Sequence, residues 1–218
     1  MLTYEEIRED QNNFLKELKK KKKPYFVDIN GVKIILFSDV FLPSTDSKLM
    51  IEYIKVSKND KILDLTTGCG LFSVIAGLQG ATGVAVDINP EAVKNANENF
   101  KRFDLRFKAV KSDFFQNIPK EKFDYIFSNG PYIEGNVTEP LEYAFFGARK
   151  YIDTLFRESS KYLKKNGKML ITFAEWGEIE YFEKTAKNSG YKFRVLGKKS
   201  NTDGKRVYRL YELTKKES

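Results

Sequence analysis

Three acidic residues and a pair of glycines are spaced along the chain in a way that suits a nucleotide ligand. The segment Asp64-Leu-Thr-Thr-Gly68-Cys-Gly70 ends one short apolar run and leads directly into a helical pattern. Glycines in such a turn let a ligand approach the backbone closely. Asp87 stands nineteen residues after Gly68, at the end of the next run, where a carboxylate can hold two ribose hydroxyls. With Asp113 after the run that follows, these residues predict a nucleotide site.

A dinucleotide-dependent dehydrogenase would use a similar turn, but its third glycine would fall at Ser73, and it requires no acid at Asp64. Two glycines with three strand-end acids instead resemble the class I S-adenosylmethionine-dependent methyltransferases, over about residues 44–213. The resemblance implies S-adenosylmethionine as the cofactor and no metal ion. The implied cofactor-binding residues are Asp46 and Thr66, Asp64 toward the ammonium, Gly68 and Gly70 beside the methionine, Asp87 on the ribose, Ile88, Asp113 and Phe114 around the adenine, and Asn129.

A fourth motif, Asn129-Gly130-Pro131-Tyr132, follows the apolar run 123–127. It resembles the Asn-Pro-Pro-Tyr signature of amino-methyltransferases, which modify planar nitrogens of bases or of glutamine side chains. Such a nitrogen is a poor nucleophile, because its lone pair is delocalised. The Asn129 oxygen and the next backbone carbonyl can accept its N–H groups, and a tyrosine face can stack on the planar group. The resemblance makes these four residues the catalytic set, with Gly130 in place of a rigid proline.

These residues need a parallel sheet that brings several strand ends together. Short apolar runs alternate with helical patterns from about residue 44, which indicates βαβ crossovers. We therefore expect a doubly wound α/β fold, Rossmann-like, with a seven-stranded and mostly parallel sheet. The expected strands are Lys61–Leu65, Gly83–Val86, Leu105–Val110, Phe123–Phe127, Lys168–Phe173, Tyr191–Leu196 and Arg206–Leu213. The expected helices are Ser47–Val56, Leu71–Leu78, Pro90–Phe103, Arg149–Lys165 and Glu178–Asn188.

Ahead of this pattern, residues 1–43 predict a small helix and β-hairpin appendage to a cofactor-binding domain of residues 44–218. Asn30-Gly31 between two β-rich runs is typical of a type I′ turn, which needs positive φ at both positions. The helix is amphipathic and ends in five lysines, Lys19–Lys23. These lysines are either a solvated helix end or a contact for RNA phosphates.

Composition removes other kinds of chemistry. The 218 residues include no histidine, which excludes a Ser-His triad, a His-ligated metal and a His general base. Cys69 is the single cysteine, so the chain can form neither a disulfide framework nor a thiolate zinc site, and we expect Cys69 to fill the turn. Since there is no run of about 18 apolar residues and no signal-peptide stretch, we expect a cytoplasmic protein without a membrane partner.

The acceptor stays open between two classes. A net charge of +8 and the basic appendage favour a base amine, such as adenine N6, in structured ribosomal or transfer RNA. The segment from Glu139 to Gly147 resembles instead the protein-glutamine methyltransferases that act on release factors, and abundant Lys with few Gln can also reflect a hot habitat. A non-catalytic cofactor- or RNA-binding subunit is the third hypothesis, with Gly130 as the mark of a decayed site.

Overall fold

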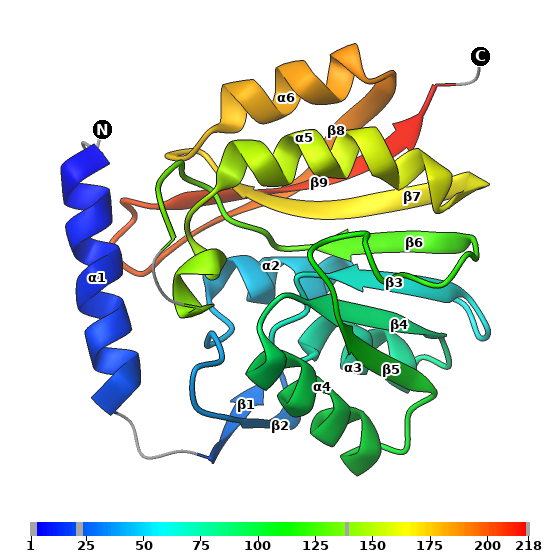
Figure 1. The fold of residues 1–218 in the computed structure, drawn as a ribbon, viewed down its shortest axis with the longest axis horizontal. Coiled ribbons are helices and arrows are strands. Elements are labelled where there is room, and N and C mark those ends of the chain that lie inside the picture. The colour runs from blue at the N-terminus through cyan, green and yellow to red at the C-terminus, as the bar shows by residue number, and fades with distance from the viewer. Residues whose placement is uncertain (1–3, 21–23, 138–139, 217–218) are drawn as a thin grey trace.

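Figure 1 shows the fold in a computed structural model, which describes residues 4–20, 24–137 and 140–216. Its seven-stranded sheet has the order β5-β4-β3-β6-β7-β9-β8. The pairings of β9 are antiparallel and the others are parallel. The strands of this sheet are β3 (Lys61–Leu65), β4 (Thr82–Asp87), β5 (Phe107–Lys111), β6 (Phe123–Ser128), β7 (Leu163–Ala174), β8 (Tyr191–Ser200) and β9 (Val207–Lys215).

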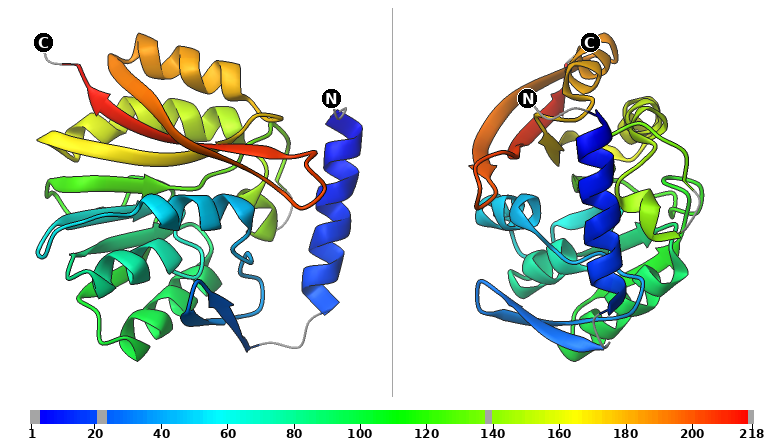
Figure 2. Two further views of the ribbon diagram at one scale, coloured as in Figure 1. Left: turned by 180° about the vertical axis from the view of Figure 1, so that it is seen from behind. Right: turned by 90° about the vertical axis from the view of Figure 1, so that its left-hand side faces the viewer.

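Helices cover both faces of the sheet. The views in Figure 2 place α2 and α3 on one face and α5 and α6 on the other, and α4 packs against β4 and β5. Because both faces are covered, β3 is buried almost throughout, with its apolar Ile62, Leu63 and Leu65 fully inaccessible. The helices are α2 (Thr45–Tyr53), α3 (Leu71–Leu78), α4 (Pro90–Arg102), α5 (Ala148–Glu158) and α6 (Ile179–Asn188), with 3-10 turns η1 (Pro140–Ala144) and η2 (Ser159–Lys161). The expected doubly wound α/β class is confirmed.

The helix expected over residues 149–165 runs too far. In the structure α5 ends at Glu158, and Leu163 already belongs to β7. The reason is tertiary pairing, because the Phe123 N–H donates to the Tyr162 carbonyl at 2.7 Å and Phe123 pairs with Leu163. These backbone groups are bonded to the neighbouring strand and are not available to a helix.

The expected N-terminal hairpin forms a separate two-stranded sheet of β1 (Tyr25–Ile29) and β2 (Val32–Leu36). Asn30 and Gly31 both have positive φ, 51° and 82°, as a type I′ turn requires. Two buried asparagines of α4 hold the hairpin. Asn95 accepts from the Phe37 N–H, Asn99 accepts from the Ile35 N–H, and both side chains donate to the Ile35 carbonyl.

Helix α1 (Tyr4–Lys20) stands across the end of the molecule toward which the central parallel strands point (Figure 1). Its Ile7 is buried in a small cluster with apolar residues of the chain after β6, and its Asp10 pairs with Arg206 at 2.6 Å. Of the lysine run, Lys20 pairs with Glu17, and Lys21–Lys23 lie outside the described residues. Among the helices that the structure describes, none is long and apolar enough to cross a membrane.

Candidate active site

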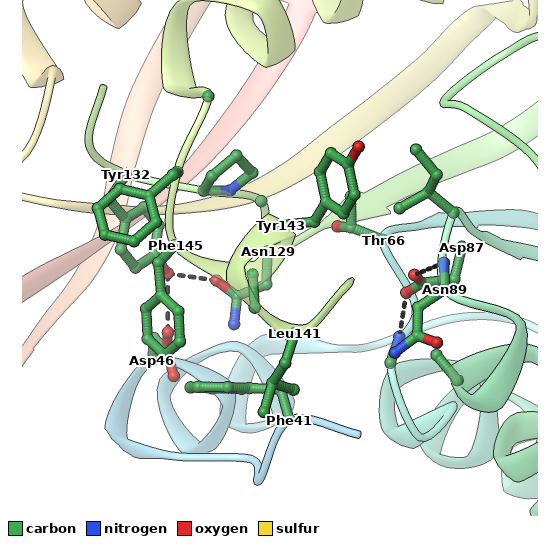
Figure 3. Close-up of a pocket in the computed structure, with 18 of the residues that line it drawn as sticks. Phe41, Asp46, Thr66, Asp87, Asn89, Asn129, Tyr132, Leu141, Tyr143 and Phe145 are labelled. Atoms are coloured by element: carbon green, nitrogen blue, oxygen red, sulfur yellow. Dashed lines mark hydrogen bonds between the residues drawn. The ribbon is translucent and has the colours of Figure 1, made fainter. Parts of the chain in front are cut away.

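A cavity of about 520 Å³ opens at the carboxyl ends of β3, β4 and β6. The strand order reverses between β3 and β6, which is where open α/β sheets bind ligands. Figure 3 shows Asp87 and Asn89 on one side of the cavity, with Asn129, Tyr132 and Asp46 on the other. Of the residues predicted from the sequence, the lining includes Asp46, Thr66, Gly68, Asp87, Ile88, Asp113, Phe114, Asn129, Gly130, Pro131 and Tyr132.

The two glycines of the first turn have different surroundings. Gly68 has a φ of 55°, and no atom lies within 4 Å of the place where a Cβ would stand. Gly70 does not line the cavity, and a Cβ there would lie 2.8 Å from the Phe100 ring and 3.0 Å from Ala96. Gly68 therefore leaves room beside the cavity, whereas Gly70 lets α4 pack closely behind the turn.

Asp64 lies behind the turn and is fully buried, so it too is absent from the cavity wall. Its Oδ2 accepts from the Thr67 hydroxyl and from both the N–H and the hydroxyl of Ser73. Its Oδ1 has no partner among the described residues, and burial raises the pKa of this carboxyl to about 6. A buried carboxylate that lacks a cation fits the ammonium group that the resemblance places beyond the turn.

Asp87 is fixed at the end of β4 by two backbone donors. Its Oδ2 accepts from the Gly68 N–H and its Oδ1 from the Asn89 N–H, both at 2.9 Å. Asn89 caps α4 by accepting from the Glu91 N–H, which orients the start of that helix. Since each carboxylate oxygen can accept more than one bond, Asp87 keeps acceptor capacity for ribose hydroxyls.

On the expected adenine side, Asp113 is bonded to a residue that the sequence analysis missed. Lys150, on α5, pairs with the Asp113 carboxylate at 2.9 Å and lies 5.7 Å from the centre of the Phe114 ring. Phe114 has a φ of 50°, and its carbonyl accepts from the Ser112 hydroxyl. Asp113 and Phe114 are thus at the cavity, and their contact with adenine stays a prediction.

The Asn129-Gly130-Pro131-Tyr132 segment leaves β6 and forms a hydrogen-bond network with α2 and β7. The Tyr132 hydroxyl lies 2.8 Å from Asp46 Oδ2 and also contacts Asn129 Oδ1, which accepts from the Thr172 hydroxyl at 2.7 Å. The Tyr132 side chain is 7% exposed, and its ring packs edge-on against Phe173. Asp46, predicted as a cofactor contact, is bonded here to Tyr132 of the motif predicted as catalytic.

Several residues that line the cavity or bond to its lining carry no signal in the sequence. Thr172 lies inside the apolar run of β7, and Lys150 is one of several charged residues on α5. Trp176, Arg206 and Tyr208 reach the cavity from the far half of the sheet. Their position depends on how β9 inserts between β7 and β8, which the chain order does not reveal.

Cys69 does not serve as a nucleophile in this setting. It is buried in the turn, and burial raises the pKa of its thiol to about 12. The thiol therefore stays protonated near neutral pH and fills the turn as a small apolar side chain.

The sheet order, the glycine turn and the acids at the strand ends define a class I S-adenosylmethionine-dependent methyltransferase. The chain belongs to the methyltransferase small domain family, which matches residues 37–192. A methyltransferase from Pyrococcus furiosus has the same fold, with a TM-score of 0.65 at 17% identity over 96% of this chain and 98% of that one. A methyltransferase-like protein solved with S-adenosylhomocysteine also has a TM-score of 0.65, at 17% identity over 88% of this chain and 57% of that one.

Two curated relatives differ in their acceptors. One, from Methanocaldococcus jannaschii, is provisionally named a protein N5-glutamine methyltransferase and is 35% identical over 78% of this chain and 89% of its own length. The other, a tRNA1(Val) (adenine(37)-N6)-methyltransferase from a Flavobacteriaceae bacterium, is 31% identical over 61% of this chain and 59% of its own length. Both belong to the amino-methyltransferases that the sequence motif indicates.

Proposed function

We propose that this enzyme transfers a methyl group from S-adenosylmethionine to the side-chain amide nitrogen of a glutamine in a protein acceptor. The observation that carries the proposal is the match with the N5-glutamine methyltransferase relative, which extends over 89% of that protein. The tRNA relative matches over a smaller share of both chains. Of the two acceptors that the sequence leaves open, this favours glutamine over a base amine.

The motif residues supply the acceptor contacts. S-adenosylmethionine provides, when bound, an electrophilic methyl group on its sulfonium. The Asn129 side-chain oxygen and the Gly130 backbone carbonyl would accept the two N–H bonds of the amide nitrogen and hold its lone pair toward that methyl group. Neither acceptor needs a histidine, and the chain has none.

Asp46 helps to keep the Asn129 oxygen available. The Tyr132 hydroxyl carries one proton and has Asp46, Asn129 and Thr172 within reach. A carboxylate is the strongest acceptor of the three, so the proton goes to Asp46. One lone pair of the Asn129 oxygen is then used by the Thr172 hydroxyl, and the other remains for the acceptor amide.

The charges around the cavity also support a protein acceptor. The basic side chains among the described lining residues are Lys150 and Arg206, and each is in an ion pair, with Asp113 and Asp10 respectively. The wall near Asn129 includes Phe41 and Phe145, whose rings meet edge to face at 5.1 Å (Figure 3). Paired cations and an apolar wall suit a side-chain amide better than a phosphate backbone.

The test is transfer of labelled methyl from S-adenosylmethionine into an extract of ribosomes and release factors that lacks this activity. We expect label that protease removes and nuclease does not, on a peptide whose glutamine gains one methyl group by mass spectrometry. Asn129→Ala should lower the rate at least a hundredfold at saturating S-adenosylmethionine, because it removes an acceptor contact.

A matched control is Asn136→Ala, which changes an exposed asparagine of the lining outside the motif and should retain activity. Nuclease-sensitive label would contradict the glutamine proposal and favour a base amine in RNA. Full activity in Asn129→Ala would contradict the role given to the motif.

A further inference from the structure

Gly130 has no space for a side chain. A Cβ at this position would lie 2.5 Å from Cζ of Tyr151 and 2.7 Å from two further atoms of the same ring. Its φ is not among the positive values, so the glycine is needed for space and not for backbone freedom. The ring of Tyr151, on α5, therefore occupies the volume that a proline ring or any other side chain at residue 130 would need.

The hydroxyl of Tyr151 contacts residues on both sides of Asn129. It donates to the Ser128 hydroxyl oxygen at 2.9 Å, and the backbone N–H of Gly130 is directed toward it. A proline has no N–H, so this polar contact requires a residue other than proline at position 130. Tyr151 is fully buried, and both contacts are therefore shielded from water.

The contact continues to the first glycine turn. Ser128 Oγ lies 3.1 Å from Thr66 Oγ1, and the Thr66 hydroxyl donates to the Leu65 carbonyl. The hydroxyls can then form a chain in which Tyr151 donates to Ser128, Ser128 donates to Thr66, and Thr66 donates to the end of β3. On the other side, the Tyr151 ring packs at 5.7 Å from the ring of Phe114.

We propose that Tyr151 is a positioning residue that fixes the Asn129–Gly130 peptide, in place of the rigid proline that the signature has at this point. Its effect on rate rests on the proposed function, because the acceptor nitrogen is held by the Asn129 side chain and the Gly130 carbonyl. Gly130 and Tyr151 therefore act as a pair, since the glycine leaves the space that the Tyr151 ring occupies. A glycine in the motif is thus compatible with a precisely held loop.

The test is Tyr151→Phe, which keeps the ring and removes only the hydroxyl. We expect kcat for the acceptor to fall about tenfold to a hundredfold, as for a small misplacement of an acceptor contact, while S-adenosylmethionine affinity stays within twofold. We also expect hydrogen exchange at the Gly130 amide to become at least tenfold faster. This second measurement reports the contact between the Tyr151 hydroxyl and the Gly130 N–H, and it does not need a methyl acceptor.

The control is Tyr191→Phe, because Tyr191 is equally buried and its hydroxyl bonds to Ser159 at 2.7 Å instead of to Ser128 beside the motif. It should destabilise the fold to a similar extent and leave both kcat and Gly130 exchange unchanged. Unchanged Gly130 exchange in Tyr151→Phe, or faster exchange with an unchanged kcat, would overturn the proposal. If the wild-type enzyme methylates no glutamine, the proposed function fails, and Gly130 exchange still tests the contact with Tyr151.

Discussion

At the scale of single residues, the buried charge of Asp64 makes cofactor binding depend on pH. Burial raises its pKa to about 6, so the carboxyl is mostly protonated at pH 5 and mostly charged at pH 7. A ligand with an ammonium group favours the charged form. We expect S-adenosylmethionine affinity, measured by calorimetry, to weaken about tenfold as the pH falls from 7 to 5.

The unliganded protein should respond to pH in the opposite sense. A carboxyl whose pKa is raised by folding binds its proton more tightly in the folded chain, so stability falls as the pH rises from about 4 to 6. Asp64→Asn should remove this loss of stability. It should also reduce the pH dependence of S-adenosylmethionine affinity to the part due to Asp87, because burial raises the pKa of that carboxyl as well. An unaltered tenfold dependence in Asp64→Asn would exclude Asp64 as its source.

At the scale of elements, Asn99 joins three parts of the chain. Its side chain bonds to both backbone groups of Ile35 in β2 and donates to the Cys69 carbonyl in the glycine turn. Asn99→Ala would leave these buried groups without partners and should cost about 2–4 kcal/mol of unfolding free energy in urea. Cofactor affinity should fall as well, since the turn loses a contact.

Asn97→Ala is the matched control for Asn99→Ala. Asn97 is on the same helix and bonds in the same way to both backbone groups of Ala109 in β5, away from the hairpin. It should destabilise the protein without faster hydrogen exchange at the Ile35 amide. If both variants speed this exchange equally, Asn99 does not hold the hairpin specifically.

The secondary structure shows which elements could be predicted from the sequence and which could not. Lys61–Leu65 and Leu71–Leu78 were predicted to the residue, because a buried strand, a glycine turn and a helix start all agree locally. Leu163–Lys165 was predicted wrongly as helix, because pairing with β6 decides its conformation.

In the site, the spacing of Asp87 from Gly68 predicted a residue that does lie at the cavity. The positions of Thr172 beside Asn129 and of Tyr151 beside Gly130 could not be predicted, because they depend on the packing of segments that are distant in the sequence.

At the scale of the whole molecule, the question is how much of the net charge of +8 acts on an acceptor. Many described basic residues are engaged in surface ion pairs, including Lys61 with Glu121, Lys164 with Asp124, and Arg206 with Asp10 at the cavity. Each such pair uses one acid for one base, so the pairs fix where these side chains lie and leave the net charge of +8 unchanged. A protein acceptor needs no row of cations along a phosphate backbone, so the glutamine proposal assigns this net charge no part in acceptor binding.

This distinction is measurable through ionic strength. Binding of RNA through six to ten phosphate contacts would lose roughly 10³–10⁵ in affinity between 50 and 200 mM salt. For a protein acceptor we expect kcat/KM to change less than about fivefold over the same range, because exposed charges contribute little and are screened. If activity on a short RNA falls steeply with salt and activity on a glutamine peptide does not, the net charge serves a nucleic acid. A shallow profile on the glutamine-bearing protein would agree with a net charge that takes no part in acceptor binding.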